Sequence, residues 1–185
     1  MQTGNVSHCA GKHDGLPLLD ERKLITYFGP QARAIVIGAN DLSRYLCQFA
    51  LSLGFEVIVC DPREEYIKSW QLLDVEVSQE MPDDLIERLQ PDTRTAVVAL
   101  THDPKLDDLA LIDALQSQAF YVGAIGSRRN SALRRERLGT YFNITESELD
   151  ALHGPAGISI GSKTPVEIAL SIIAEIVSIK NGLHQ

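Results

Sequence analysis

The sequence has few cysteines, no long hydrophobic run and no excess of positive charge, and each absence excludes a class of protein. The cysteines are three, without a C-x-x-C pair, which argues against a disulfide framework and for a reducing compartment. No apolar run approaches the roughly 20 residues that cross a bilayer, and the N-terminal residues do not have the pattern of a secretion signal. The net charge of −8 and the pI near 5.1 argue against general binding to nucleic acid or to anionic membranes, because both require a basic surface. We therefore expect a cytoplasmic protein that binds neither nucleic acid nor membranes.

The sequence does contain an alternation of strand-like and helix-like segments. Short apolar runs rich in β-branched residues occur at residues 34–37, 56–60, 96–100 and 119–122. Such runs are typical of strands buried on both faces of a parallel sheet. Between the first two runs, apolar residues recur at helical spacing over residues 42–53, and Gly54 follows in the position of a C-cap glycine. The predicted fold class is α/β, a Rossmann-like, doubly wound, mostly parallel sheet with helices on both faces.

Residues 1–30 differ from the rest of the chain in being polar and Gly-rich, with only a weakly apolar stretch. We expect them to form an N-terminal arm and residues 31–185 to form one domain, since 185 residues with 44% hydrophobic content suit a single core. A weaker strand is predicted near residues 74–77, and a helix near residues 82–89.

Several helix starts are marked by side chains that satisfy free backbone amides. The Asp-Pro pair at residues 103–104 predicts a helix that ends near Gln116. Two capping boxes, each a threonine followed three residues later by a glutamate, predict helices that start after Thr145 and Thr164. The last of these, residues 165–180, is apolar on most of its faces, so it crosses the core or meets a partner subunit. We therefore expect a homodimer.

The turn after the first predicted strand is a damaged dinucleotide fingerprint. Where the fingerprint has G-x-G-x-x-G/A, this chain keeps only Gly38 and has Asn40 and Asp41 at the following positions. Asn40 tolerates a left-handed backbone, but its side chain and the Asp41 carboxylate are expected where a diphosphate would approach the helix. Asp61 ends the second strand, where an acidic residue either binds a ribose hydroxyl or only begins the next turn. The residues of this turn leave two equal alternatives, a domain that binds a nucleotide and a domain that keeps the fold but has lost nucleotide binding.

A second loop should face this turn, because ligands of doubly wound folds bind where the strand order reverses. Thr101, His102 and Asp103 follow the 96–100 run. His102 has a side chain that can exchange a proton near pH 7. The alternative is that Thr101 and Asp103 cap the following helix and His102 is a solvated loop residue.

The strongest candidate for a binding site in the sequence is the segment after the apolar run at residues 119–122. Gly126 and Ser127 form a glycine turn with a serine N-cap, and Arg128 begins the helix. Free amides, the positive end of the helix and a guanidinium group together predict a site for an anion or phosphate. The arginines that continue this run, Arg134 among them, are interpreted as a solvated helix face without a role.

The histidines of the N-terminal arm and the three cysteines are the remaining candidates for metal binding or reactivity. His8, Cys9 and His13 lack a fourth ligand and a scaffold, so we predict no metal site. Cys47 falls on the apolar side of the first helix and is predicted to be core. Cys60 is either close to the ligand crevice or a small buried hydrophobe.

Four motifs in order resemble the Rossmann domain of the xanthine dehydrogenase accessory (XdhC/CoxI) family. They lie at residues 100–108, 121–129 with 134–138, 152–157 and 160–169. The resemblance implies a role in maturing molybdenum hydroxylases, in which the protein binds the molybdenum cofactor (molybdopterin) and helps to insert it into a client enzyme. A cysteine desulfurase is a second candidate partner, and dimers are common in the family.

The sequence departs from the family's pattern at two points. The family usually has a Gly-Ala-Gly-His turn, where this chain has Gly38-Ala-Asn40-Asp41, which places NAD(P) binding in doubt. We also expect the family's separate N-terminal domain to be absent, since residues 1–30 are too short to replace it.

Three functions therefore compete. The resemblance favours a maturation factor for molybdenum enzymes rather than an enzyme. Asp61 would permit an NAD(P)-dependent oxidoreductase, although the sequence has no evident catalytic set such as a Tyr-x-x-x-Lys pair. Asn40 and Asp41 would suit a dimeric regulatory module without a cofactor.

Overall fold

The computed structural model describes residues 18–20, 23–25 and 31–183 of the chain. It divides into two compact units, Met1–Gln31 and Ala32–Gln185. In the first unit, strands β1 (Leu18–Asp20) and β2 (Lys23–Ile25) pair antiparallel. The sequence positions considered for a metal, His8, Cys9 and His13, lie outside the described residues.

The second unit is built on a six-stranded parallel sheet with strand order β5-β4-β3-β6-β7-β8. Its strands are β3 (Arg33–Ile37), β4 (Glu56–Cys60), β5 (Glu76–Ser78), β6 (Thr95–Ala99), β7 (Tyr121–Ala124) and β8 (Leu152–His153). The order reverses between β3 and β6, so two loops diverge there at the carboxyl end of the sheet. The predicted Rossmann-like α/β fold is therefore confirmed.

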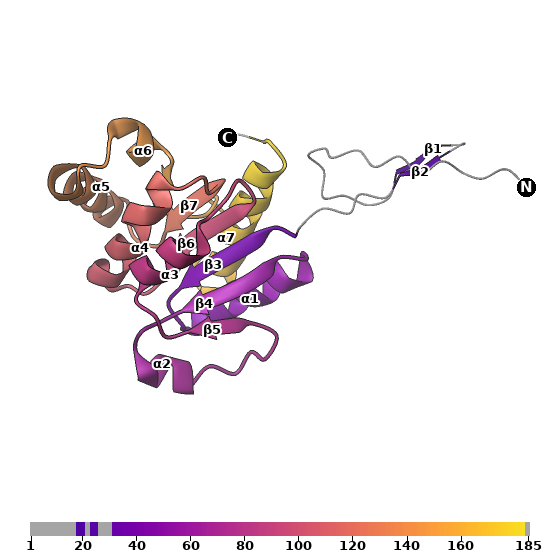
Figure 1. Cartoon of the computed structure of the whole chain (residues 1–185), viewed down its shortest axis with the longest axis horizontal. Helices are drawn as coiled ribbons and strands as arrows, with labels where there is room; N and C mark the ends of the chain where they lie inside the picture. The colour runs from indigo at the N-terminus through magenta and orange to yellow at the C-terminus, as the bar shows by residue number, and fades with distance from the viewer. Residues whose placement is uncertain (1–17, 21–22, 26–30, 184–185) are drawn as a thin grey trace, which may run out of the picture. The chain divides into compact units, whose positions relative to one another are not determined.

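The described chain contains seven helices, and the longer ones pack on the two faces of this sheet (Figure 1). The helices are α1 (Asp41–Ser52), α2 (Glu64–Lys68), α3 (Pro82–Leu89), α4 (Pro104–Gln116), α5 (Arg128–Phe142), α6 (Glu146–Asp150) and α7 (Pro165–Lys180). In the described residues no helix is long and apolar enough to cross a membrane.

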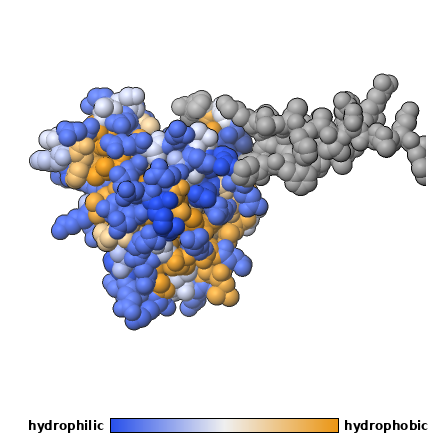
Figure 2. Space-filling view, in the orientation of Figure 1, coloured by the Kyte–Doolittle hydropathy of each residue, from blue (hydrophilic) through white to orange (hydrophobic). Residues whose placement is uncertain are grey.

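The core consists of two apolar clusters on opposite faces of the sheet. Alternate residues of a strand point to opposite faces, so Val36 of β3 packs with residues of α1 and α7, whereas Ile35 and Ile37 pack with residues of α3 and α4. All three side chains are fully buried. The surface seen in Figure 2 is largely hydrophilic with smaller apolar areas, in keeping with the acidic composition.

The predicted helix caps are present. The Asp103 side chain accepts a hydrogen bond from the Lys105 amide, and both predicted capping boxes form, at Thr145 and at Thr164. Gly54 follows α1 with a φ of +79°. Cys47 is buried in the core, as predicted.

Two strands begin two residues later than the sequence predicts, whereas the other predicted strands agree within one residue. The run at residues 119–122 becomes β7 only from Tyr121, because the Ser117 hydroxyl accepts a hydrogen bond from the Ala119 amide and extends the turn after α4. Ala119 still packs against the core. The apolar run therefore indicated which residues are buried, and not which residues pair with the neighbouring strand. The weak strand lies at Glu76–Ser78 instead of 74–77. The short elements α2 and β8 were not predicted, since five and two residues carry too little periodicity.

Candidate functional site

Three loops lie side by side at the carboxyl ends of β3, β6 and β7, which are neighbours in the sheet. The first two are in direct contact, because the Asn40 Nδ2 donates to the Leu100 carbonyl oxygen at 2.7 Å. Gly38 has a φ of +107°, and a Cβ there would lie 3.0 Å from the Thr101 backbone. Gly38 is therefore required for the close approach of the two loops.

Asn40 is the N-cap residue of α1. Its Oδ1 accepts hydrogen bonds from the Ser43 amide at 3.0 Å and from the Ser43 hydroxyl at 3.2 Å. Both ends of the Asn40 amide are bonded to the protein, so this side chain occupies an amide at the start of α1 that a diphosphate would otherwise bond. Asp41 is the first residue of α1, and its side chain projects to solvent, with 80% of it exposed and an ion pair to Arg44 at 3.2 Å.

Asp61 is fully buried and its oxygens are engaged by the protein. It accepts from the Ala39 amide at 2.9 Å and from the Arg63 amide and guanidinium at 2.7–3.1 Å. Burial raises the pKa of Asp61, but the hydrogen bonds from Arg63 and Ala39 outweigh burial and hold the pKa below its ordinary value. These contacts favour a structural role in the turns after β3 and β4 over the binding of a ribose hydroxyl.

A buried polar network joins the second loop to the third. The Asp107 carboxylate accepts from the Thr101 amide at 3.1 Å and from its hydroxyl at 2.7 Å. The Arg134 guanidinium bonds Asp107 at 3.0 Å, Asp108 at 3.3 Å and the Ile125 carbonyl oxygen at 3.1 Å. Burial raises the pKa of Asp107, while Thr101 and Arg134 oppose the rise.

The interpretation of Arg134 as part of a solvated face is therefore wrong. Its side chain is only 7% exposed, because α5 packs against α4 and turns Arg134 inward. The helical spacing of the arginines could not show this. The available signal was the pair Asp107-Asp108 beside the apolar residues of the same helix, since buried carboxylates need a cationic partner.

The remaining predicted residues of the second loop lie at its surface. His102 is exposed and has a φ of +62°. Asp103 is used as the N-cap of α4. The structure thus brings His102 to the edge where a ligand would bind, with its side chain directed to solvent.

The third loop forms the N-terminus of α5 as predicted. Gly126 has a φ of +155°, and the Ser127 hydroxyl accepts from the Asn130 amide at 3.1 Å. The first turn contains no acidic residue, and Arg128 is exposed beside it. The first amides of a helix lack intrahelical partners and carry a partial positive charge, so this terminus is chemically suited to an anion.

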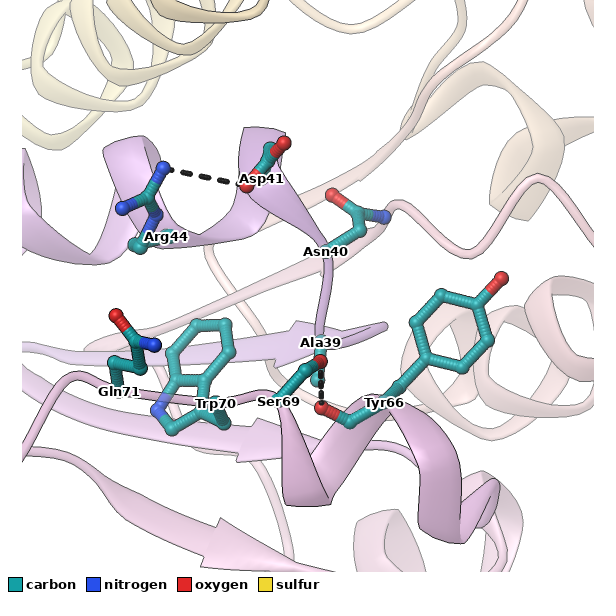
Figure 3. A pocket seen from close by; sticks show the side chains of 8 residues that line it. All are labelled: Ala39, Asn40, Asp41, Arg44, Tyr66, Ser69, Trp70 and Gln71. Atoms are coloured by element: carbon teal, nitrogen blue, oxygen red, sulfur yellow. Dashed lines mark hydrogen bonds and ion pairs between the residues drawn. The ribbon is translucent and has the colours of Figure 1, made fainter.

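A cavity of about 370 Å³ lies beside the first loop, lined by residues of α1 and of the segment that contains α2. Figure 3 shows Asp41 and Arg44 on one wall and Trp70 and Gln71 on the opposite wall. Sequence reasoning missed Arg44, Trp70 and Gln71. Arg44 is connected to Asp41 by the i,i+3 spacing of a helix, whereas no local spacing connects Trp70 and Gln71 to Asp41. A second cavity, of about 780 Å³, lies between α3 and α4 and is lined mostly by polar residues, Glu87 and Asp113 among them.

The described cysteines are not reactive groups. Burial raises the pKa of both Cys47 and Cys60 to about 12, and the Cys60 thiol donates to the Glu80 carbonyl oxygen at 3.3 Å. Of the two interpretations of Cys60, the small buried hydrophobe is supported. Within the described residues, no group of three potential ligands is placed to hold a metal ion.

The parallel sheet with its reversed strand order defines a doubly wound, Rossmann-like α/β protein, and its loops meet at the carboxyl edge of the sheet. Comparison with protein families then matches residues 34–176 to the XdhC Rossmann domain. The chain belongs to that family.

Two of the relatives have names that refer to molybdenum cofactor insertion or to xanthine dehydrogenase. A third, from Escherichia coli K12, is named only as the uncharacterized protein YqeB and is 30% identical over 164 residues, covering 85% of this chain and 29% of YqeB. The chain is 35% identical over 96 residues to the molybdenum cofactor insertion chaperone PaoD of Escherichia coli K12, a match that covers 52% of this chain and 29% of PaoD. It is 28% identical over 172 residues to a probable xanthine dehydrogenase subunit of Bacillus subtilis 168, covering 88% and 48% of the two chains. A crystal structure described as a xanthine dehydrogenase from Bacillus halodurans superimposes with a TM-score of 0.70 at 27% identity, covering 84% of this chain and 44% of that one.

The chain spans less than half the length of the curated relatives that it matches. What those whole proteins do therefore bears on this chain only as a proposal.

Proposed function

We propose that this protein binds the molybdenum cofactor (molybdopterin) and delivers it to a xanthine dehydrogenase-type molybdenum hydroxylase. Relatives named as a cofactor insertion chaperone and as a xanthine dehydrogenase subunit support the proposal. The single structural observation that carries it is the N-terminus of α5, where Arg128 stands beside free helix amides in an otherwise acidic chain. We assign this terminus to the phosphate of the cofactor.

The residues at this edge fit a phosphate. Ser127 uses its hydroxyl to cap only the Asn130 amide, which leaves earlier amides of α5 for a ligand. Arg128 adds charge-assisted hydrogen bonds of the kind that phosphates accept. The buried Arg134 holds the Ile125 carbonyl and thereby fixes the loop that precedes the site.

Sulfuration of the cofactor would depend on groups other than the buried thiols. A cysteine that carries sulfur must be an accessible thiolate, and the pKa of about 12 keeps Cys47 and Cys60 protonated. We therefore propose that a cysteine desulfurase, if it is a partner, supplies sulfur to the bound cofactor without passing it through Cys47 or Cys60.

The alternative of an NAD(P)-dependent oxidoreductase has less support. Asp61 already accepts four hydrogen bonds from the protein, and the exposed Asp41 carboxylate would repel a diphosphate at α1. We propose that NAD(P) binds weakly or not at all. We also propose that the protein acts as a cytoplasmic homodimer through α7.

The test is native purification from cells that make the cofactor, followed by mass spectrometry and metal analysis of the ligand retained. Wild-type protein should retain a pterin phosphate with molybdenum. Arg128→Ala should weaken binding by about 1.5–3 kcal/mol, the range for a hydrogen bond to a charged group, without lowering thermal stability, since Arg128 is exposed.

Arg88→Ala is the matched control, because Arg88 is an exposed arginine on α3. It should leave ligand retention unchanged. Equal retention by Arg128→Ala and wild type, or unfolding of Arg128→Ala, would show that this segment is only a structural turn.

A further inference from the structure

The cavity beside α1 has the size and position of a small-molecule site. Its volume of about 370 Å³ lies at the small end of the roughly 300–1,000 Å³ range of such sites. It opens where the loop after β3 meets the segment after β4, at the carboxyl edge that ligands of doubly wound folds use. Its lining combines an indole, a carboxylate, a guanidinium and an amide, from Trp70, Asp41, Arg44 and Gln71.

The Asp41 carboxylate is the charged hydrogen-bond acceptor in this lining. Only its Oδ1 is paired, to Arg44 at 3.2 Å, and 80% of the side chain is exposed. A carboxylate can accept about four hydrogen bonds, so Asp41 can still accept from a ligand. By contrast, Asp61 and Asn40 are occupied by the turns that they hold.

The opposite wall is aromatic. Figure 3 shows the six-membered ring of Trp70 directed toward Arg44, across the cavity from Asp41. An indole of this kind is a surface on which a flat ring stacks, and such contacts are worth about 1–3 kcal/mol for nucleobases. The site therefore suits a flat heterocycle that carries hydrogen-bond donors at one edge.

We propose that this cavity binds a fused ring with a 2-amino-4-oxopyrimidine edge, the chemistry shared by guanine and pterins. That edge presents two adjacent N–H donors, which match the two oxygens of a carboxylate in the same way that an arginine fork does. The ring stacks beside Trp70 and its donors bond Asp41. The pterin source rests on the cofactor role proposed above, whereas the guanine source does not.

The experiment uses the tryptophan itself as the probe, because Trp70 is the only tryptophan of the chain. Guanosine, pterin and adenosine are titrated separately into the full-length protein while tryptophan fluorescence is recorded. Guanosine or pterin should quench the signal with saturation, and adenosine, whose ring edge lacks the paired donors, should bind at least about tenfold more weakly. The tighter of the first two ligands identifies the source.

Asp41→Asn should weaken the binding of guanosine and pterin by about tenfold or more, since one oxygen becomes an NH₂ group and the charge is lost. Asp84→Asn is the matched control, because Asp84 is an exposed acid in the first turn of another helix, α3. Equal binding of adenosine and guanosine, unchanged binding by Asp41→Asn, or no saturable quenching would each overturn the proposal. None of these ligands carries a phosphate, so failure here is distinct from failure of the anion site at Arg128.

Discussion

Single buried residues hold the loops of the candidate site in place. Asp61 is the clearest case, since its carboxylate joins the Ala39 amide after β3 to Arg63 after β4. Arg63 is in turn held over the Tyr66 ring, 3.9 Å from its centroid. The charge of an exposed acid contributes little to the free energy of unfolding. Asp61 is completely buried, so its ionisation state affects the stability of the fold.

Asp61→Asn should lower the free energy of unfolding by about 1–3 kcal/mol at neutral pH, because an amide cannot accept all of these hydrogen bonds. The folded-state pKa of Asp61 lies below the ordinary value of 3.8. Its stabilisation is therefore complete above the unfolded-state pKa and is lost as pH falls from about 4 through the folded-state pKa. Urea denaturation of both proteins between pH 7 and pH 3 measures this difference.

The difference between wild type and Asp61→Asn should shrink over that acidic range. A difference that stayed constant from pH 7 to pH 3 would mean that the Asp61 charge does not stabilise the fold.

At the scale of elements, the network of Arg134 connects helices α4 and α5 with the loops after β6 and β7. Asp107 and Asp108 belong to α4, and Arg134 belongs to α5. Because Asp107 also holds Thr101 and Arg134 also holds Ile125, movement of one loop would disturb the other. The anion site proposed at α5 is thus connected to the loop that carries His102.

Arg134→Ala should lower the free energy of unfolding by about 3–5 kcal/mol, the cost of leaving a buried carboxylate without its partner. Arg134→Lys should recover only part of this loss, because one ammonium group cannot reach Asp107, Asp108 and Ile125 in the geometry of a guanidinium. Chemical denaturation measures both changes.

The control for this pair is Arg88→Ala, which removes a salt bridge between exposed side chains and should change stability little. If Arg134→Ala were as stable as Arg88→Ala, the buried network would not contribute to stability.

At the scale of the whole molecule, α7 leaves apolar surface uncovered. One side of this helix packs on α1 and β7, with Ile172 and Ile176 buried. On the other side, Val166 is 40% exposed and Leu170 is 49% exposed. Their spacing of four residues places them on one face of the helix, which is the face proposed to meet a second copy.

The protein should be a dimer by light scattering at about 50 µM, a concentration at which a specific micromolar dimer forms. Leu170→Glu should shift it to the monomer, because a charge would be buried in an apolar contact. Leu73→Glu is the control, since Leu73 is 93% exposed in the segment before β5, and it should leave the mass unchanged.

A wild-type monomer at this concentration would contradict the dimer. A dimer that survives Leu170→Glu would place the interface on a different face.

Local sequence signals were sufficient to predict the order of the elements and the position of most helix ends. Apolar runs in strand-sized segments report burial on both faces of a sheet, and side chains such as Asp103, Ser127 and Thr164 cap helices through local hydrogen bonds. Apolar runs and helix caps both involve residues a few positions apart. They can therefore be recognised in the amino-acid sequence without knowledge of the fold. For the same reason the four motifs were sufficient to indicate the family.

Which polar side chains remain available to a ligand depends on tertiary packing. Arg128 and Arg134 are both arginines of α5, yet one is exposed and the other buried against Asp107, because packing on α4 selects one face of the helix. In the same way, Asn40 and Asp61 are occupied by backbone groups that are far from them in sequence, while Asp41 faces a cavity with Trp70. These pairings join residues tens of positions apart, and no local spacing determines them.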